Sequence, residues 1–404
     1  MRSRSQLARR ARALGSLVLA ALIVCTASAG AATGKWAIAS IANPGGTNQS
    51  FLAGVSCRTV RTVTTCIAVG SFVSTKGDVL PLIERWNGKR WTVTKGPVKK
   101  GAIASALVGV SCVTPSNCIA VGSVRASVKT PTLPLAERWD GKTWKTLAAR
   151  APSGATHSYL NAVSCTGAKS CYAVGGFTSG ATMGSTLVER WNGSRWSIMG
   201  SPNPGNASSA MLSGVSCTGA GAAVTCAAVG SFATRPVGNP NYAVALRLIH
   251  GKWALQNTPK VGNDQSNSLT SVSCTGPKNC FAAGARRSGL GAGLIEHWNG
   301  AKWAVASAAN PPGAALSQLN GISCATRTNC VATGLSSKDT ATHASLINRW
   351  NGRRWVIQPS PAPAHAAGSA LSAASCTSVG RCFVVGTYLT PKFANPPAGF
   401  SARH

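Results

Sequence analysis

Acidic side chains are scarce in this sequence. Its 404 residues include 8 Asp and Glu against 40 Lys and Arg, which gives a formal net charge of +32. Five of the arginines lie between Arg2 and Arg12, so the rest of the chain carries 32 − 5 = +27. A chain with so few carboxylates has little scope for chemistry that needs paired acids, and its basic surface should attract polyanions in a salt-sensitive way. Outside the cytoplasm these polyanions are wall polymers, anionic lipid headgroups, acidic polysaccharides and released DNA.

Apolar runs of membrane length are absent after the first 31 residues. The first 31 residues have the order of a secretory signal: basic residues, an apolar run from Leu14 to Cys25, then small residues up to Ala31. A retained membrane anchor is the alternative, but the apolar run of about a dozen residues is short for a bilayer span. We therefore predict a signal peptide at residues 1–31 and a secreted protein, extracellular or associated with the cell wall. The export route and lipidation at Cys25 stay open.

Metal-binding cysteine spacings are also absent: the sequence has no Cys-x2-Cys pair and no His at fixed offsets from Cys. Cys25 lies in the signal, and the other 14 of the 15 cysteines form seven local pairs. An even count in an exported chain predicts disulfides, and we predict neither a metal nor a cofactor. The predicted disulfides are Cys57–Cys66, Cys112–Cys118, Cys165–Cys171, Cys217–Cys226, Cys274–Cys280, Cys324–Cys330 and Cys376–Cys382.

Gly and Pro are frequent, at 44 and 21 residues, which is typical of many short strands and turns. The pairs belong to a repeated unit whose first cysteines are separated by 55, 53, 52, 57, 50 and 52 residues. A period near fifty with four short apolar segments per repeat predicts a β-propeller rather than a helical solenoid.

One repeat shows the four expected strands. Strand a runs over 52–57, strand b over 66–72 and strand c over 82–86, and strand d begins near Trp91. Asn87-Gly88 predicts a tight primed turn between strands c and d, because Asn and Gly tolerate positive φ. Trp86 and Trp91 flank this turn and should pair across the hairpin. One repeat departs from the pattern, with Ile249 read in place of the first Trp.

The two ends of the chain complete one repeat. Residues 34–40 resemble a strand d without its partner, and residues 399–404 resemble a strand c without its turn. We therefore predict an all-β fold: one domain at residues 32–404, with seven repeats of about 53 residues. This domain is a seven-bladed propeller of four-stranded antiparallel blades, in which the N-terminal strand d pairs with the C-terminal three strands and removes the open edges.

The repeated Val-Ser-Cys…Trp-Asn-Gly-x-x-Trp unit resembles secreted bacterial β-propeller repeats of the Asp-box (BNR, sialidase-like) and kelch-like groups. Of the Asp-box turn Ser-x-Asp-x-Gly-x-x-Trp, the Gly-x-x-Trp part persists here. The kelch Gly-Gly pair appears once, as Gly175-Gly176, and elsewhere a single Gly such as Gly70 stands in strand b. The resemblance covers the chain after the signal and implies a propeller fold, but not the activities of those groups.

Basic residues recur in the turns between strands c and d. A ring of such side chains would bind an extended polyanion, with Trp edges adding contacts to sugars or bases. The alternative is that they only keep the Trp hairpins soluble. The candidate binding residues are Lys35, Lys89, Arg90, Lys142, Arg195, Lys252, Lys302, Arg353 and Arg354. On the opposite face the b–c loops and d–a connections vary, which is typical either of a binding surface on a rigid scaffold or of unconstrained loops.

Few carboxylates remain for catalysis. Glu84, Glu137, Glu189 and Glu296 share one strand-c position, and we interpret them as scaffold residues paired with a neighbouring Arg. Asp140 is a turn residue. This leaves the weak catalytic candidates Asp78, Asp264 and Asp339 in loops of the variable face. A sialidase-like Tyr–Glu nucleophile finds no match, because Tyr172 sits at a core position of the repeat.

The leading hypothesis is a secreted, non-catalytic binding propeller for anionic or glycan ligands of the cell envelope, monomeric and without a membrane segment after signal removal. A glycoside hydrolase or lyase of sialidase-like propeller type, using the three aspartates, is the alternative enzyme. A structural platform for a protein partner on the variable-loop face is the third hypothesis.

Overall fold

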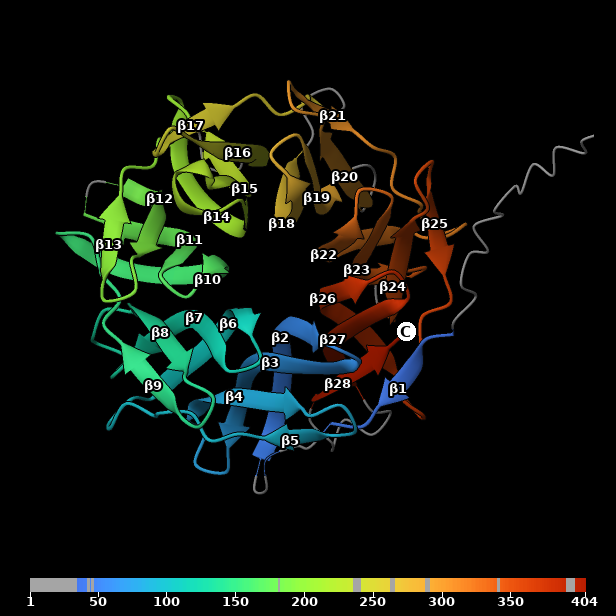
Figure 1. The fold of residues 1–404 in the computed structure, drawn as a ribbon, viewed down its shortest axis with the longest axis horizontal. Helices are drawn as coiled ribbons and strands as arrows, with labels where there is room; N and C mark the ends of the chain where they lie inside the picture. The colour runs from blue at the N-terminus through green and yellow to red at the C-terminus, as the bar shows by residue number, and fades with distance from the viewer. Residues whose placement is uncertain are drawn as a thin grey trace, which may run out of the picture. The chain divides into compact units, whose positions relative to one another are not determined.

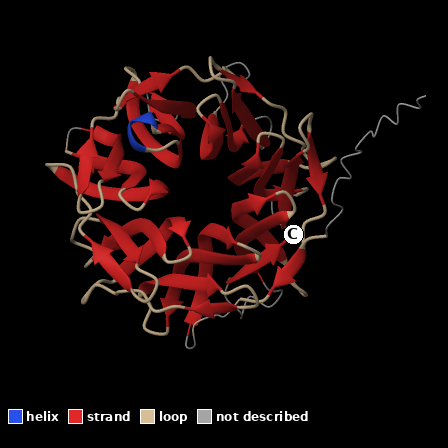
Figure 2. Cartoon of the chain, viewed as in Figure 1, coloured by secondary structure: helices blue, strands red, loops and turns tan. Residues whose placement is uncertain are grey.

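The computed structural model describes residues 35–41, 44, 47–180, 182–234, 241–261, 266–287, 291–339, 342–389 and 397–404. The expected signal peptide and Cys25 lie outside this part of the chain. The described residues belong to one compact unit, Gly34–His404, and no described helix is long and apolar enough to cross a membrane. Strand dominates the unit, apart from one short 3-10 helix, η1 (Gly221–Ala223) (Figure 2).

Four consecutive strands make one antiparallel sheet. In the sheet of β10 (Ala155–Gly167), β11 (Ser170–Ser179), β12 (Thr182–Trp191) and β13 (Trp196–Met199), each strand pairs with the next. Three further sheets repeat this order: β14 (Ala207–Thr218), β15 (Thr225–Thr234), β16 (Asn241–Ile249) and β17 (Lys252–Gln256); β18 (Asn267–Gly276), β19 (Asn279–Arg286), β20 (Ala292–Trp298) and β21 (Trp303–Val305); β22 (Leu316–Thr326), β23 (Asn329–Ser337), β24 (His343–Trp350) and β25 (Trp355–Gln358).

The first eight strands after β1 form two such groups that share one parallel contact, Val79 with Ala104. These groups are β2 (Thr47–Val60), β3 (Val63–Ser74), β4 (Val79–Trp86) and β5 (Trp91–Val93), then β6 (Ala104–Thr114), β7 (Asn117–Arg125), β8 (Leu133–Trp139) and β9 (Trp144–Leu147). The inner strands are longer than their apolar runs predict, because the ladder continues through polar residues such as Thr59 and Thr64.

The last sheet combines the two ends of the described chain. It contains β26 (Gly368–Ser378), β27 (Arg381–Leu389), β28 (Ala398–Arg403) and β1 (Ala37–Ala39), with β1 antiparallel to β28. This pairing agrees with the expectation from the sequence, and it places Trp36 against His404, with ring centroids 5.2 Å apart. Figure 1 shows all these sheets arranged radially, with β2, β6 and β10 near the centre and β5, β9 and β13 at the perimeter.

A bulge in the innermost strand explains the single glycine of strand b. In β6 the register shifts between Leu107 and Gly109, opposite Gly122 of β7. A Cβ on Gly122 would lie 1.9 Å from the carbonyl oxygen of Ala106, so no side chain fits there. The same close approach recurs at Gly70, Gly175, Gly230, Gly284, Gly334 and Gly386.

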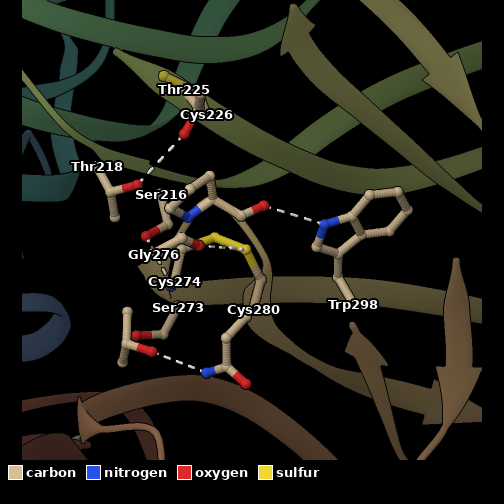
Figure 3. The surroundings of a disulfide bond; sticks show 12 residues. Ser216, Thr218, Thr225, Cys226, Ser273, Cys274, Gly276, Cys280 and Trp298 are labelled. Atoms are coloured by element: carbon tan, nitrogen blue, oxygen red, sulfur yellow. Dashed lines mark hydrogen bonds between the residues drawn. A yellow bond between two sulfur atoms is a disulfide. The ribbon is translucent and has the colours of Figure 1, made fainter. Parts of the chain in front are cut away.

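Hydrogen bonds link each sheet to the next through the Ser-Cys pair of the innermost strand. The amide of Cys274 donates to Ser216 Oγ of the preceding sheet at 2.9 Å, beside the Cys274–Cys280 disulfide (Figure 3). The same bond joins Cys112 to Ser56, Cys165 to Ser111, Cys217 to Ser164, Cys324 to Ser273 and Cys376 to Ser323. A seventh bond runs from Cys57 to Ser375 and joins the first sheet to the last.

All seven predicted disulfides are present, each between directly paired residues of the two inner strands, as in Cys57–Cys66. The apolar core lies between neighbouring sheets. One buried cluster, for example, joins Leu52 and Trp86 of the first sheet to Phe383 and Val385 of the last. Tyr172 is buried in another of these clusters, as its repeat position predicts.

Candidate functional site

The c–d turns present their basic residues through a capping side chain. Asn87 Oδ1 accepts hydrogen bonds from the amides of Lys89 and Arg90 at 2.9 and 3.0 Å. The prediction of a two-residue primed turn is wrong for these repeats, because the loop has four residues and only Gly88 has positive φ, at 100°. Asn87 therefore acts as an acceptor for the turn amides. The predicted pairing of Trp86 with Trp91 is confirmed, with ring centroids 5.8 Å apart.

The exceptional repeat has the primed turn that was expected elsewhere. His250 and Gly251 have φ of 48° and 78°, and Ile249 pairs with Lys252. Leu248, not Ile249, is opposite Trp253 and so occupies the position of the first Trp, which corrects the reading from the sequence. A two-residue primed turn has positive φ at both positions, so the glycine stands one place later in this turn, while Leu248 pairs with Trp253 in the same register as Trp86 with Trp91.

All nine basic candidates from the sequence have exposed side chains, namely Lys35, Lys89, Arg90, Lys142, Arg195, Lys252, Lys302, Arg353 and Arg354. Lys35 precedes β1, Lys252 begins β17, and the other seven lie in the turns β4–β5, β8–β9, β12–β13, β20–β21 and β24–β25. The strands that follow these turns lie at the perimeter (Figure 1). The fold therefore distributes these bases around its rim and does not gather them in one pocket.

One of the turns borders a larger hollow, which we call the basic groove. It has a volume of about 350 Å³ and lies between the first and last sheets. Lys89 of the β4–β5 turn, Arg381 of β27 and Arg403 of β28 line it, together with His404 and Trp86. The corresponding hollows between β2–β5 and β6–β9, and between β22–β25 and the last sheet, have only about 10 Å³ each.

The arginines of the groove are held by neighbours. The Arg403 guanidinium lies over the Trp86 ring, 5.2 Å from its centroid, and Arg381 Nη1 donates to the Thr62 carbonyl at 3.3 Å. Both arginines and Lys89 are exposed, and none of the described residues that line the groove is Asp or Glu. Three cations around the buried Trp86 ring have the charge and donors that suit an anion or an anionic sugar.

Sequence reasoning did not find Arg381, Arg403 or Trp86 as site residues. A signal was present for Arg403, because an Arg recurs after the glutamate position of strand c. Arg247 of β16 makes the equivalent contact with the next sheet, 4.5 Å from the Trp298 ring centroid. Whether this Arg contacts the following sheet depends on how the sheets pack. The repeat pattern does not reveal that packing.

The four repeated glutamates are fully buried, and the hydrogen bond to Glu189 comes from a backbone amide and not from a guanidinium. Glu189 Oε2 accepts a hydrogen bond from the backbone amide of Arg150 in the preceding connection, at 3.0 Å. Asn348 takes the same place in β24 and accepts from the amide of Ala309 at 2.9 Å. Arg190 follows Glu189 directly in β12 and faces the opposite side of the sheet, because successive strand residues alternate.

Proline removes that donor in two other places. The two donors, Arg150 and Ala309, each lie six residues after the second Trp of a hairpin. At the same distance, the connections that precede Glu137 and Glu296 have Pro97 and Pro259, which carry no backbone N–H. Neither carboxyl of Glu137 or Glu296 has a hydrogen-bond partner, and their exposed fraction is 0%. Burial raises the pKa of both to about 8, and that of Glu189 to about 7. These are interior carboxyls rather than a catalytic pair.

The weak catalytic candidates do not converge in the described residues. Asp78 lies in the β3–β4 hairpin, where its amide donates to Ser74 Oγ at 3.2 Å. Asp339 lies in the β23–β24 hairpin, two sheets away, where its Oδ1 accepts from Ser337 Oγ and from the Thr342 amide. Asp264 lies outside the described residues. Neither Asp78 nor Asp339 lines the basic groove. Among the residues that the structure describes, no three His, Cys, Asp or Glu come together as a metal site.

Comparison with known proteins gives the fold class. No family profile and no curated protein sequence matches the chain. Among solved structures, a polysaccharide lyase, PL25 ulvan lyase, is 11% identical with a TM-score of 0.53, covering 84% of this chain and 92% of the lyase. A protein of unknown function from Dyadobacter fermentans is 10% identical with a TM-score of 0.51, covering 91% of this chain and 97% of that one.

The Aleuria aurantia lectin, a six-bladed β-propeller, is 13% identical with a TM-score of 0.47 and covers 78% of this chain and 99% of its own. The similar structures are β-propeller proteins, and this chain is a propeller-repeat protein. Identities this low carry the fold and not the function.

Proposed function

We propose that this chain is an exported, non-catalytic propeller that binds an anionic polymer or acidic glycan of the cell envelope through the basic groove. The observation that carries the proposal is the cluster of Lys89, Arg381 and Arg403 beside Trp86, with no acidic side chain among the described lining residues. The exposed bases of the other c–d turns would extend the contact around the rim. A polymer of regularly spaced charges would engage several of them at once.

The export and domain assignments belong to the same proposal. Residues 1–31 act as a secretory signal, and residues 32–404 form one domain of seven blades closed by β1. Seven disulfides fit an oxidising compartment. The seven Ser–Cys bonds, including Cys57 to Ser375, support a closed ring of blades.

Binding rather than hydrolysis is favoured by the placement of the acids. A glycosidase needs two carboxyl groups about 5–10 Å apart across one sugar linkage. Asp78 and Asp339 belong to hairpins of sheets that are not neighbours, and the repeated glutamates are buried.

Chromatography on immobilised heparin and on wall-polymer resin tests the proposal. The mature protein should be retained at low salt and elute as ionic strength rises past about 0.15 M, where surface charges are screened. A triple variant with Lys89→Gln, Arg381→Gln and Arg403→Gln should elute at clearly lower salt. No retention of the unmodified protein at low salt would overturn the proposal.

A matched control separates the groove from net charge. Lys76→Gln, Lys129→Gln and Lys338→Gln remove the same three charges from exposed residues of the b–c hairpins. This control should bind nearly as the unmodified protein does. If both triple variants elute at equally lowered salt concentrations, the result would contradict a binding site in the groove.

A further inference from the structure

A second and larger hollow lies away from the basic groove, over the sheet β14–β17. We call it the aromatic pocket. Its volume is about 640 Å³, and its lining comes from the ends of β15 and β17, the start of β16 and the connection that follows β17. These segments belong to the face of the b–c hairpins and d–a connections, because the start of each inner strand contacts the preceding b–c hairpin, as in Val79 N to Ile103 O. The pocket and the basic groove have no lining residue in common.

Two aromatic rings form part of the pocket wall. Phe232 of β15 and Tyr242 of β16 are cross-strand partners, with ring centroids 5.5 Å apart and planes at 37°. Both side chains are only partly buried. An adjacent pair of partly exposed rings on one wall presents a continuous apolar face.

The repeat does not require this pair. The same register position holds at most one aromatic residue in each of the other described sheets. It is occupied by Phe72 with Leu80, Val124 with Leu133, Phe177 with Ser185, Arg286 with Ala292, Ser336 with Ala344, and Tyr388 with Ala398. A feature that one blade has and the scaffold does without points to a local role.

Carboxamides surround the aromatic wall. Asn206 and Asn257 are exposed at its edge, and Gln256 is partly buried. Each carboxamide offers both donors and an acceptor, which suits the hydroxyl groups of a sugar. Among the described residues that line the pocket there is no Asp or Glu, and Lys260 is the single cation.

Hydrogen bonds hold the pocket wall in place. The amide of Ala243 donates to Asn267 Oδ1 at 2.7 Å, and Thr258 Oγ1 donates to the Ala243 carbonyl at 3.2 Å. The Thr258 bond ties the connection after β17 to β16, the strand that carries Tyr242. Asn267, the other partner of Ala243, is buried. A preformed wall lowers the entropy that a ligand loses on binding.

We propose that the aromatic pocket binds a short oligosaccharide, independently of the basic groove. The C–H face of a sugar ring packs on Phe232 and Tyr242, while its hydroxyls bond to Asn206, Gln256 and Asn257. The volume lies in the range of about 300–1,000 Å³ that is typical of ligand sites. The described lining residues supply apolar contacts and hydrogen-bonding groups, which is the chemistry of a binding site.

The experiment is a glycan array with neutral, uronate-bearing and sulfated oligosaccharides, followed by calorimetry with the best-bound compound at low and high salt. Tyr242→Leu and Asn257→Ala should each weaken binding about tenfold or more, as expected for a central contact of a binding site. Binding should change little with salt, because the contacts are mainly uncharged.

Controls keep this result separate from the function proposed above. Phe177→Leu alters the same register position in the preceding sheet and should leave the affinity unchanged, as should the triple variant of the basic groove. Asn257 is exposed, so its variant is expected to fold normally. Binding of no oligosaccharide on the array would overturn the proposed pocket. So would an affinity of both pocket variants equal to that of the unmodified protein. A loss of retention on heparin or wall-polymer resin that is confined to the groove variant concerns the groove and leaves the pocket proposal unaffected.

Discussion

The backbone amide of Cys57 donates a 2.9 Å hydrogen bond to Ser375 Oγ across 318 residues of sequence. It is the same bond that links every other neighbouring pair of sheets through Ser and Cys, for example Ser164 to Cys217. The bond between the ends of the chain therefore repeats the geometry found within it. The first and last sheets are therefore joined by the same contact as the other sheets, and β1 pairs with β28 within the last sheet.

Replacing this serine should destabilise the fold. Ser375→Ala leaves the buried Cys57 amide without an acceptor, which costs about 1–3 kcal/mol. The free energy of unfolding, measured with denaturant, should fall by that amount, and the amide of Cys57 should exchange faster with deuterium. Ser153→Ala, at an exposed turn residue, is the control. An effect of Ser375→Ala no larger than that of the control would show that the bond is not stabilising.

Substitution of the strand-b glycine should be far more severe. In Gly122→Ala the new methyl group would lie 1.9 Å from the Ala106 oxygen and 2.9 Å from Leu107 Cα. Backbone must move to relieve this contact, so we expect a loss of at least about 3 kcal/mol, or no soluble protein. Gly167→Ala is the matched control, because nothing lies within 4 Å of its Cβ position. Similar melting temperatures for the two variants would contradict the steric explanation.

The buried carboxyls should make stability depend on pH. The pKa of Glu137 and of Glu296 is about 8 in the folded protein, against a reference value of 4.5. Because the folded protein holds these protons more tightly than the unfolded chain, the two groups contribute their full stabilisation below pH 4.5. That contribution to the free energy of unfolding is lost as the pH rises from 4.5 to about 8. Melting temperatures should therefore fall across this interval.

Glutamine at these positions removes the charge and tests the cause. The double variant Glu137→Gln, Glu296→Gln should lose much of the pH dependence and melt higher than the unmodified protein at pH 8.5. The gain should be on the order of a few kcal/mol, since one pKa unit corresponds to about 1.4 kcal/mol. Glu189→Gln is the comparison: its carboxylate already has a donor in Arg150, so its gain should be smaller. An unchanged pH profile in the double variant would contradict this assignment.

Each disulfide should contribute modestly. Cys112→Ala with Cys118→Ala opens a loop with a sequence separation of 6 residues. In the chain-entropy treatment this costs about 2 kcal/mol. The hydrogen bond from residue 112 to Ser56 uses the backbone amide and should remain. Denaturant unfolding of this pair and of Cys57→Ala with Cys66→Ala should give similar losses; folding that fails for only one pair would contradict equivalent roles.

Much of the fold could be predicted because the same pattern of residues recurs in each repeat. The spacing of Cys57 and Cys66 predicted their disulfide, and residues 34–40 and 399–404 predicted the pairing of β1 with β28. The details that failed are local and depend on backbone geometry. Asn87 was expected to adopt positive φ, yet it caps the turn amides, and the register of Leu248 could not be read without the two-residue turn at His250.

The candidate sites were less predictable. The exposure of the turn bases followed from the pattern, but the basic groove needs Lys89 and Arg403, which are 314 residues apart and meet only when the first and last sheets adjoin. Phe232 and Tyr242 are ordinary strand residues in the sequence. Only the strand register shows that they stand side by side where the other sheets have at most one ring.

The sequence alone determined the repeat, its strands, its cysteine pairs and the basic charge, because each of these depends on residue type and local spacing. The tertiary structure decided which side chains became sites. Sheet packing buried the glutamates, placed Arg403 over Trp86, and formed the basic groove and the aromatic pocket. Those contacts join residues far apart in the chain, and no local pattern encodes them.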